Sequence, residues 1–215
     1  DNPRILVDTS PDMRAQLLDA DVWQVDAILF THAHADHVNG IDDIRTLNYH
    51  KGGALDAFAS AQTLDILQER FGYIFEPYRD VNPQFWRPCL NPKVIDGPFM
   101  IGDIEIQPFA QEHGRMPSLG FRFGPFAYST DVKTLPEEAF ELLDGIEVWI
   151  VDALSENPHP THSHVDQTLD WITRVGSKRA VLTHLSHRPD YARLAARLPA
   201  GVEPGIDGMV IRIPE

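Results

Sequence analysis

The chain has a single cysteine, Cys89, in 215 residues, so it cannot form a disulfide within itself. This scarcity fits a reducing compartment, and the sequence predicts a cytoplasmic protein whose one thiol is a small buried apolar side chain. No apolar run approaches the length of about 20 residues that a membrane-spanning helix needs, and no signal-peptide pattern is present. A membrane protein is therefore not expected.

Positive charge is also scarce, because 18 lysines and arginines stand against 32 acidic residues and give a net charge of −14. No run rich in lysine or arginine interrupts this balance. Such a surface repels long polyanions, so a long nucleic acid is disfavoured as a partner and a small substrate is favoured. Association into a homodimer is compatible with the sequence.

The length and composition predict one globular domain over residues 1–215, since 43% of the residues are hydrophobic and 23% are charged. Apolar runs and periodic patterns alternate along the chain. Strands are predicted over 5–8, 28–30, 54–59, 104–109, 119–123, 126–130, 148–151, 179–183 and 209–213. Helices are predicted from 11–19, 41–47, 61–71, 137–143, 165–175 and 191–198, with Ser163 and Asp166 spaced as a capping box at the fifth of them.

Residues 72–98 differ from the rest in texture, because they combine several aromatic side chains with four prolines between Pro77 and Pro92. The sequence predicts an irregular insertion here. Two interpretations are equally supported: a lid over a ligand, or a packed loop without a binding role.

Four potential metal ligands follow one predicted strand within six residues, in the sequence ILFTHAHADHVNG of residues 28–40. His32 and His34 are two residues apart, so on extended backbone they point the same way and can chelate one ion. Asp36 and His37 lie past the bend and can face a second ion. Imidazole and carboxylate ligands suit zinc, manganese or iron better than magnesium or calcium.

Further polar residues recur where predicted strands stop. His113, Asp131, Asp152 and His184 each follow an apolar strand, which would bring them together at one edge of a sheet. A histidine-rich loop of sequence HPTHSH, residues 159–164, lies between two of these positions.

The segment THAHADH resembles the HxHxDH signature of the metallo-β-lactamase superfamily, and the resemblance extends over nearly the whole chain. The later segments HPTHSH, AVLTHLSH and GIDGMV are most similar to the phosphoribosyl cyclic phosphate phosphodiesterases of phosphonate breakdown and, more loosely, to the tRNA 3′-processing nucleases. The resemblance implies an α/β (α+β) fold, a four-layer αββα sandwich. The abrupt start at Asp1 is consistent with N-terminal strands that lie upstream of this chain.

The resemblance also implies a dinuclear centre that holds two divalent metal ions, zinc or manganese. Its seven implied ligands are His32, His34 and His113 on the first ion, Asp36, His37 and His184 on the second, and Asp131 between them. A hydroxide that bridges the metals would be the nucleophile, and Asp36 would orient it.

A histidine of the 159–164 loop would face the substrate, to hold phosphate or to protonate the leaving oxygen. His162 and His164 are both candidates, whereas His159 and His50 are interpreted as surface residues. Asp152 is either a carboxylate that orients a ligand histidine or a cap. His187 stays unassigned, because the cysteine pair that accompanies it around a structural zinc in phosphonate-degrading relatives is not in this chain.

The predicted function is metal-dependent hydrolysis of a phosphodiester in a small phosphorylated or nucleotide-like substrate, such as a small cyclic phosphate. A thioester hydrolase of the glyoxalase II type shares the same motif and remains an alternative. A non-catalytic accessory protein of cofactor biosynthesis on the same fold is another. β-Lactamases are disfavoured, since no cysteine occupies a second-metal position, and flavin-linked di-iron reductases are disfavoured, since their pattern carries a glutamate where His34 stands.

Overall fold

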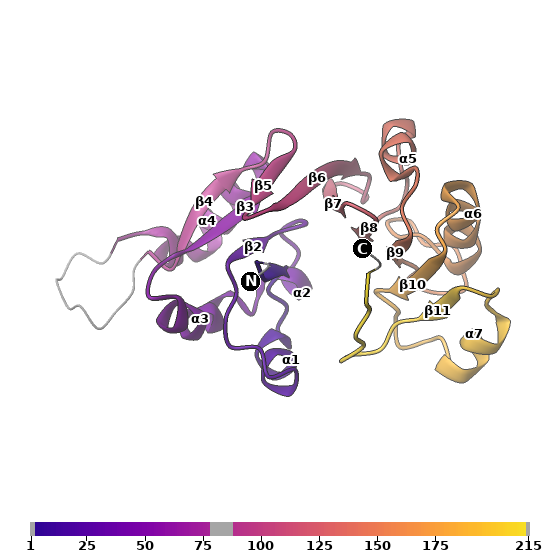
Figure 1. Cartoon of the computed structure of the whole chain (residues 1–215), viewed down its shortest axis with the longest axis horizontal. Coiled ribbons are helices and arrows are strands. Elements are labelled where there is room, and N and C mark those ends of the chain that lie inside the picture. Colours follow the sequence, from indigo (N-terminus) through magenta and orange to yellow (C-terminus); the bar gives the residue numbers. More distant parts are fainter. Residues whose placement is uncertain (1–2, 78–87, 214–215) are drawn as a thin grey trace. The chain divides into compact units, whose positions relative to one another are not determined.

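The computed structural model describes residues 3–77 and 88–213 of the chain. These residues form two compact units, Asp1–Ile104 (unit 1) and Glu105–Glu215 (unit 2), and each is described here by itself (Figure 1). Both combine a β-sheet with helices, so the predicted mixed α/β class is confirmed. Within the described residues, no helix combines the length and the apolar character that a membrane crossing requires.

Unit 1 is built on a parallel four-stranded sheet with the order β1-β2-β3-β4. Its strands are β1 (Ile5–Val7), β2 (Ala27–Leu29), β3 (Leu55–Ala59) and β4 (Leu90–Val94), and β5 (Phe99–Ile101) follows. Its helices are α1 (Met13–Asp19), α2 (Ala35–Val38), the short 3₁₀ helix η1 (Ile41–Asp43), α3 (Ile44–Lys51) and α4 (Ala61–Phe75).

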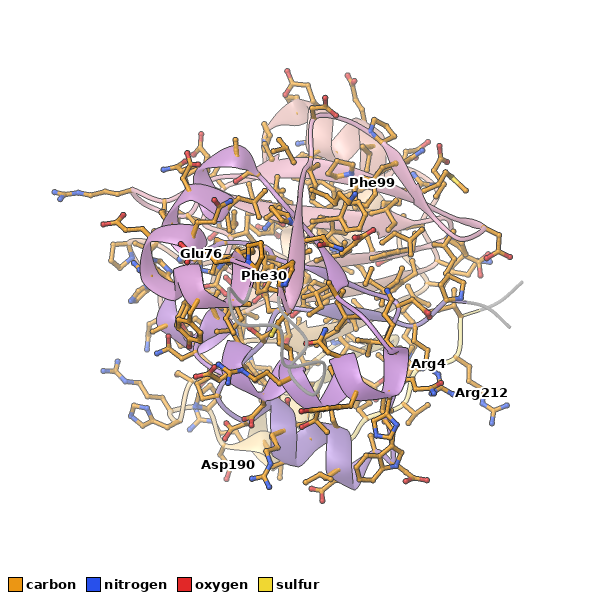
Figure 2. The ribbon with its side chains drawn as sticks, turned by 90° about the vertical axis from the view of Figure 1, so that its left-hand side faces the viewer. Arg4, Phe30, Glu76, Phe99, Asp190 and Arg212 are labelled. Carbon is orange, nitrogen blue, oxygen red and sulfur yellow. The ribbon has the colours of Figure 1, made fainter. Side chains whose placement is uncertain are left out.

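The central strand β2 and the residue after it lie in the buried core of unit 1. All three residues of β2 are buried, as expected for a central parallel strand that is covered on both faces. Phe30, which follows β2, is fully buried in the apolar core of the unit (Figure 2). Cys89 packs in the same core and is 1% exposed, which confirms the predicted buried thiol.

Unit 2 contains a mixed sheet in which antiparallel hairpins lead into parallel strands. Its strands are β6 (Ile104–Gln111), β7 (Ser118–Phe123), β8 (Phe126–Ser129), β9 (Val148–Asp152), β10 (Arg179–Thr183) and β11 (Val202–Pro204). They are ordered β11-β10-β9-β8-β7-β6, with β6–β7 and β7–β8 antiparallel and the remaining pairs parallel. Its helices are α5 (Glu137–Leu143), α6 (Val165–Val175) and α7 (Tyr191–Arg197).

One face of this sheet packs against the helices of unit 2. Trp149, Val151 and Leu182 from the central strands share an apolar core with Leu143 of α5 and Ile172 of α6. The strands β8, β9 and β10 are parallel, so their carboxyl ends point in one direction. The polar residues that follow these strands gather at that edge of the sheet.

Two local predictions were wrong. No strand forms over 209–213 in the described part of unit 2; instead β11 pairs with β10, and the amide of Gly205 extends the pairing to the Leu182 carbonyl at 2.8 Å. The capping box at α6 does not form either, because His164 is the N-cap residue and the Ser163 hydroxyl donates to the Asp152 carbonyl at 2.7 Å.

The segment 72–98, which the sequence predicted to be an irregular insertion, has regular secondary structure at both ends. Residues 72–75 complete α4, and residues 90–94 form β4, which pairs with β3. Between them, residues 78–87 lie outside the described residues, and so does the prediction of a lid at that place.

Candidate metal centre

In unit 1, the loop after β2 brings together three of the predicted ligand histidines. His32 is fully buried, and its Nε2 lies 2.9 Å from Nδ1 of His34. The rings of His32 and His37 are 4.3 Å apart between centroids. Two nitrogens bound to one cation at about 2.0–2.1 Å each lie roughly 3 Å apart, so the pair His32–His34 has the separation that chelation needs.

Asp8 contacts one of the predicted ligand histidines and was not singled out from the sequence. It follows β1 and is 6% exposed. Its Oδ1 accepts the Thr31 amide at 2.8 Å, and its Oδ2 accepts the Thr31 hydroxyl at 2.7 Å and lies 2.7 Å from His37 Nδ1. A carboxylate on Nδ1 leaves Nε2 of the imidazole for a cation. The rule that singled out Asp131 and Asp152, an acidic residue where a strand ends, would also have found Asp8.

The backbone holds this loop close to the end of β1. The Thr9 amide donates to the His37 carbonyl at 2.7 Å, and the Gly40 amide donates to the Thr9 carbonyl at 2.8 Å. A Cβ at Gly40 would lie 2.0 Å from the Ser10 carbonyl oxygen, so only glycine permits this approach. Asp36, whose side chain is 63% exposed, lies on the outer side with Oδ2 3.7 Å from His37 Nε2.

In unit 2, Asp131 lies between two of the predicted ligand histidines. The residue follows β8 and is 1% exposed. Its Oδ1 lies 3.2 Å from His184 Nε2, and its Oδ2 lies 3.3 Å from His113 Nε2. Each oxygen of one carboxylate thus faces a different imidazole, which is an arrangement compatible with a carboxylate shared by two cations.

His113 is oriented by the backbone of the histidine-rich loop. Its Nδ1 lies 2.8 Å from the Thr161 carbonyl oxygen, so it carries the proton and donates it there, and Nε2 is left facing Asp131. The next residue, Gly114, has φ +62°, and a Cβ there would lie 2.6 Å from Thr161 Cγ2. Sequence reasoning identified His113 but gave no signal for these two neighbours.

Replacing Gly114 with Ala is expected to displace His113 and to destabilise the protein by about 2–5 kcal/mol, the sum of positive-φ strain and overpacking. Gly145→Ala is the matched control, because Gly145 has φ +75° with open space around its Cβ position. Gly145→Ala should lower the free energy of unfolding only by the positive-φ strain, about 1–2 kcal/mol. Urea unfolding of both variants measures the difference, and equal losses would show that the Thr161 contact has no energetic role.

Asp152 contacts both a backbone amide and a histidine of the predicted substrate loop. Asp152 is fully buried at the end of β9, and its Oδ2 accepts the Val132 amide at 3.0 Å and lies 3.1 Å from His162 Nδ1. Its Oδ1 lies 4.0 Å from Nδ1 of His184. His162 Nε2 in turn lies 3.9 Å from Asp131 Oδ2. The imidazole is therefore held between a buried carboxylate and the predicted ligands.

The other histidines of unit 2 take different positions. His164 is the N-cap residue of α6, is half-buried, and has its Nδ1 3.3 Å from Gln167 Oε1. His159 lies beside His162 with 5.2 Å between ring centroids. His187 is exposed, and in unit 1 His50 is exposed as predicted.

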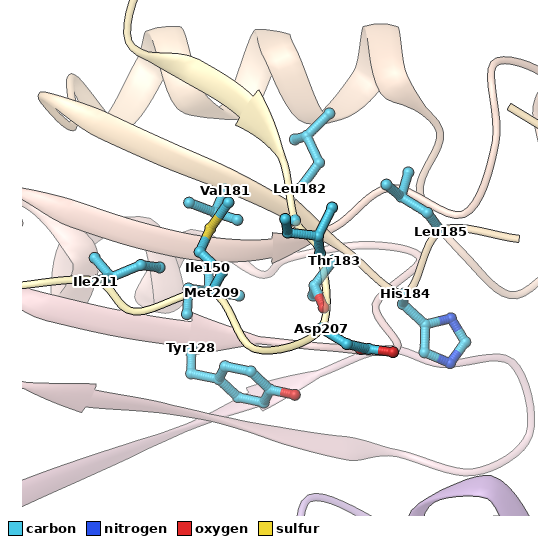
Figure 3. A pocket seen from close by; sticks show the side chains of 12 residues that line it. Tyr128, Ile150, Val181, Leu182, Thr183, His184, Leu185, Asp207, Met209 and Ile211 are labelled. Carbon is cyan, nitrogen blue, oxygen red and sulfur yellow. The ribbon is translucent and has the colours of Figure 1, made fainter. Parts of the chain in front are cut away.

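A cavity of about 540 Å³ adjoins His184, and its size is typical of sites for small ligands. Figure 3 shows His184 and the carboxylate of Asp207 at one end, and the apolar side chains of Ile150, Met209 and Ile211 at the other. The cavity can therefore accept the organic part of a small molecule whose polar group lies at the histidine.

The sequence matches the family described as "Beta-lactamase superfamily domain" over residues 3–185. The chain belongs to the β-lactamase superfamily. This confirms the resemblance and the fold class that were predicted from the THAHADH segment and the later motifs.

Solved structures agree with this assignment to the β-lactamase superfamily. A structure described as a new diphosphatase from the PhnP family is 32% identical, with a TM-score of 0.86 over 95% of this chain and 77% of that one. The short form of human tRNase Z is 20% identical, with a TM-score of 0.70 over 98% of this chain and 88% of that one, and it supports the fold alone.

Two curated relatives also match, and both are much longer than the matched region. An octanoyltransferase of Porphyromonas gingivalis is 36% identical over 216 residues, which is 99% of this chain and 43% of that protein. A ribonuclease Z of Bradyrhizobium is 32% identical over 124 residues, which is 56% of this chain and 40% of that protein. The chain thus spans less than half the length of the curated relatives.

The donor set in each unit fits a divalent cation. The close atoms are imidazole nitrogens and carboxylate oxygens, which are ligands of zinc and manganese. The Asp8 carboxylate, the Thr161 carbonyl and the Asp152 carboxylate accept hydrogen bonds from histidine Nδ1 atoms and so fix the tautomers, as is usual around metal ligands in proteins. This membership and this donor set support a metal-dependent hydrolase.

Proposed function

We propose that this chain hydrolyses a phosphodiester, or a related bond to phosphorus, in a small phosphorylated or nucleotide-like substrate. The observation that carries the proposal is the Asp131 carboxylate, whose two oxygens face His184 and His113 at 3.2 and 3.3 Å. We propose two divalent ions, zinc or manganese, with the ligands His32, His34, Asp36, His37, His113, Asp131 and His184. The PhnP-family diphosphatase and the ribonuclease Z relative support phosphorus over carbon as the attacked atom.

When bound, the cations would supply Lewis acidity to the phosphoryl oxygens and make water a better nucleophile. The chain's own residues supply the remaining chemistry. Asp36 carries an exposed carboxylate beside His37 and can accept a hydrogen bond from the attacking water. Its role is to orient that water toward phosphorus.

His162 is the proposed general acid. Its Nδ1 carries the hydrogen that Asp152 accepts, so the proton for the leaving oxygen belongs on Nε2. The buried Asp152 carboxylate stabilises the protonated ring before transfer and fixes its orientation. His164 has no comparable carboxylate partner among the described residues, so the choice that the sequence left open falls on His162.

Metal-stripped protein reconstituted with manganese or zinc tests this function against bis(p-nitrophenyl) phosphate and nucleoside cyclic phosphates. We expect turnover that a chelator abolishes and that the metal restores. A metal-replete protein that cleaves neither substrate would contradict the proposal.

His162→Ala is expected to lower kcat by about 10²–10⁴-fold for diesters with an alkoxide leaving group, the usual range for loss of a general acid. The loss should be much smaller with p-nitrophenolate, which leaves without a proton. His164→Ala is the matched control and should change kcat less than about threefold. Steady-state rates with both leaving groups measure this, and equal losses in both variants would remove His162 from the role.

A second candidate comes from the Porphyromonas gingivalis relative, whose name is octanoyltransferase. That name describes a protein more than twice as long as the matched region. Acyl transfer to water, with an octanoyl thioester as substrate, is therefore the alternative, in line with the thioester hydrolases that share the motif. Release of thiol from an octanoyl thioester without diester cleavage would favour it, and the absence of both activities would favour an accessory protein. We also propose that the protein is cytoplasmic and that it acts on small substrates rather than on long nucleic acids.

A further inference from the structure

An arginine from a distant helix bonds the peptide between the two histidines that are proposed to chelate one ion in unit 1. Nη1 of Arg70, on α4, donates to the Ala33 carbonyl at 2.6 Å. Ala33 lies between His32 and His34 and is 0% exposed, so bulk water does not reach this carbonyl. A buried carbonyl needs a donor, and here a charged side chain from 37 residues along the chain supplies it.

Hydrogen bonds also hold the loop on either side of this peptide. Before it, the Thr31 amide donates to Asp8 Oδ1 at 2.8 Å. After it, the His37 amide donates to the His34 carbonyl at 3.0 Å, where α2 begins. The Arg70 bond lies between these two anchors, at the peptide whose rotation would turn one imidazole away from the other.

The core of unit 1 in turn holds the helix that carries Arg70. Leu67, one turn earlier on α4, is fully buried in this core. Phe30 and Val38, which flank the loop, belong to the same core. The helix departs from helical geometry directly after Arg70, since Phe71 has φ −127° and ψ 34°, and the Phe71 side chain packs against the core as well. A packed helix therefore brings the guanidinium to the loop.

The contact of Arg70 differs in kind from a surface ion pair. Within residues 3–77 and 88–104, no carboxylate pairs with Arg70, whereas Arg45 of the same unit pairs with the exposed Asp42 at 3.0 Å. Loss of an exposed ion pair leaves both groups in water, and its energetic effect is small. Loss of the Arg70 bond would instead leave a buried acceptor without a donor, so the loop would have to move.

We propose that Arg70 is a positioning residue for the first ion, because it fixes the Ala33 peptide and so keeps the two chelating nitrogens at the separation that one cation needs. These nitrogens, His32 Nε2 and His34 Nδ1, lie 2.9 Å apart. The inference rests on the first of the two ions in the proposed function, but not on which bond the protein cleaves. Groups that orient metal ligands from outside change metal affinity by about 10–100-fold.

Calorimetric zinc titration of the metal-free protein tests this inference without a substrate. Arg70→Met keeps an aliphatic side chain and removes every donor, so it should weaken the binding of one zinc ion by about 10–100-fold. Arg70→Lys keeps a donor for the single bond to the carbonyl, so it should bind zinc within about threefold of wild type. Wild-type zinc affinity in Arg70→Met would overturn the inference.

Lys51→Met is the matched control in the same unit. Lys51 Nζ donates to the Asp26 carbonyl at 2.7 Å, and Asp26 precedes β2 at the end opposite the histidine loop. The variant thus removes a bond from a cation to a carbonyl that does not touch the loop, and it should keep the wild-type zinc affinity. An equal loss of zinc affinity in Lys51→Met and Arg70→Met would overturn the inference.

A double-mutant cycle shows whether Arg70 acts through the histidine pair. In a His34→Ala background one of the two nitrogens is missing, so Arg70→Met should then change zinc affinity by less than about threefold. A loss in that background as large as in the wild-type protein would overturn the inference, because Arg70 would then act elsewhere.

Diester turnover separates this inference from the proposed function. At zinc concentrations that saturate both proteins, Arg70→Met should reach a kcat within about threefold of wild type, because the defect is in metal affinity. A loss of kcat that excess zinc does not restore would place Arg70 on the substrate and overturn the inference, while the hydrolase would stand. Zinc binding with the expected dependence on Arg70, but without cleavage of any diester, would contradict the hydrolase and support the inference.

Discussion

Asp131→Asn is expected to lower kcat/KM for diester hydrolysis by about 10³-fold or more, which corresponds to roughly 4 kcal/mol of transition-state stabilisation. The reason is the geometry of one buried carboxylate, whose oxygens lie 3.2 Å from His184 Nε2 and 3.3 Å from His113 Nε2. An amide offers one oxygen and one NH₂ group, so it can serve only one cation. Elemental analysis of the purified variant should show less bound metal as well.

Asparagine is chosen because it keeps the fold. Asp131 has φ +51°, a conformation that asparagine adopts at a lower cost than alanine does. The Ser118 hydroxyl bonds the backbone carbonyl of residue 131 at 2.7 Å, and this contact does not depend on the side chain. Asp170→Asn, on the exposed side of α6, controls for the loss of a negative charge. If Asp131→Asn retained activity within about tenfold of wild type, the shared-carboxylate role would be wrong.

The second large effect is expected at Asp8. Asp8→Ala should destabilise the protein by about 3–5 kcal/mol, because the Thr31 amide, the Thr31 hydroxyl and His37 Nδ1 all lose a charged acceptor at 2.7–2.8 Å. It should also weaken metal binding by about 10–100-fold, since His37 loses the partner that fixes its tautomer. Urea unfolding of the metal-free protein and a zinc titration measure the two effects separately.

Asp21→Ala is the control for backbone strain in the same unit. Asp21 has φ +54°, close to the +59° of Asp8, and its side chain makes one exposed hydrogen bond to Trp23 Nε1. Asp21→Ala should lower the free energy of unfolding by about 1–2 kcal/mol, mostly because of the strain of the positive φ. If both alanine variants lost the same stability and metal affinity, the buried network of Asp8 would have no special role.

The sequence predicted the elements wherever a strong period or a buried run was present. The helices α5 and α6 have their predicted bounds, and each strand of the hairpin around residues 124–125 differs from its prediction by one residue at one end, because apolar spacing and turn residues agree there. The strand over 209–213 was wrong because β-branched composition alone does not say which segment reaches the open edge of β10. That edge is occupied by β11, whose three residues carry too little pattern to be recognised.

The sequence predicted which residues belong to the candidate site, but it did not predict which of their side chains contact one another. His32, His34 and His37 follow from one local motif, and the structure brings them together within unit 1. The choice between His162 and His164 was not available from the sequence, because both lie on an irregular loop without a period. It depends on which ring reaches Asp152, ten residues away from His162 along the chain.

Three residues of the two ligand groups share an unusual backbone conformation. Asp8, Asp131 and His184 each follow a strand and have φ values of +59°, +51° and +57°. Such conformations cost about 1 kcal/mol or more each and persist only where the surroundings impose them. At the end of β1 the surrounding backbone helps to impose this conformation, because the Thr9 amide donates to the His37 carbonyl at 2.7 Å. We therefore expect these three turns to reject β-branched residues, so that Asp8→Val, Asp131→Val and His184→Val should each lose stability through the backbone as well as through the missing side chain.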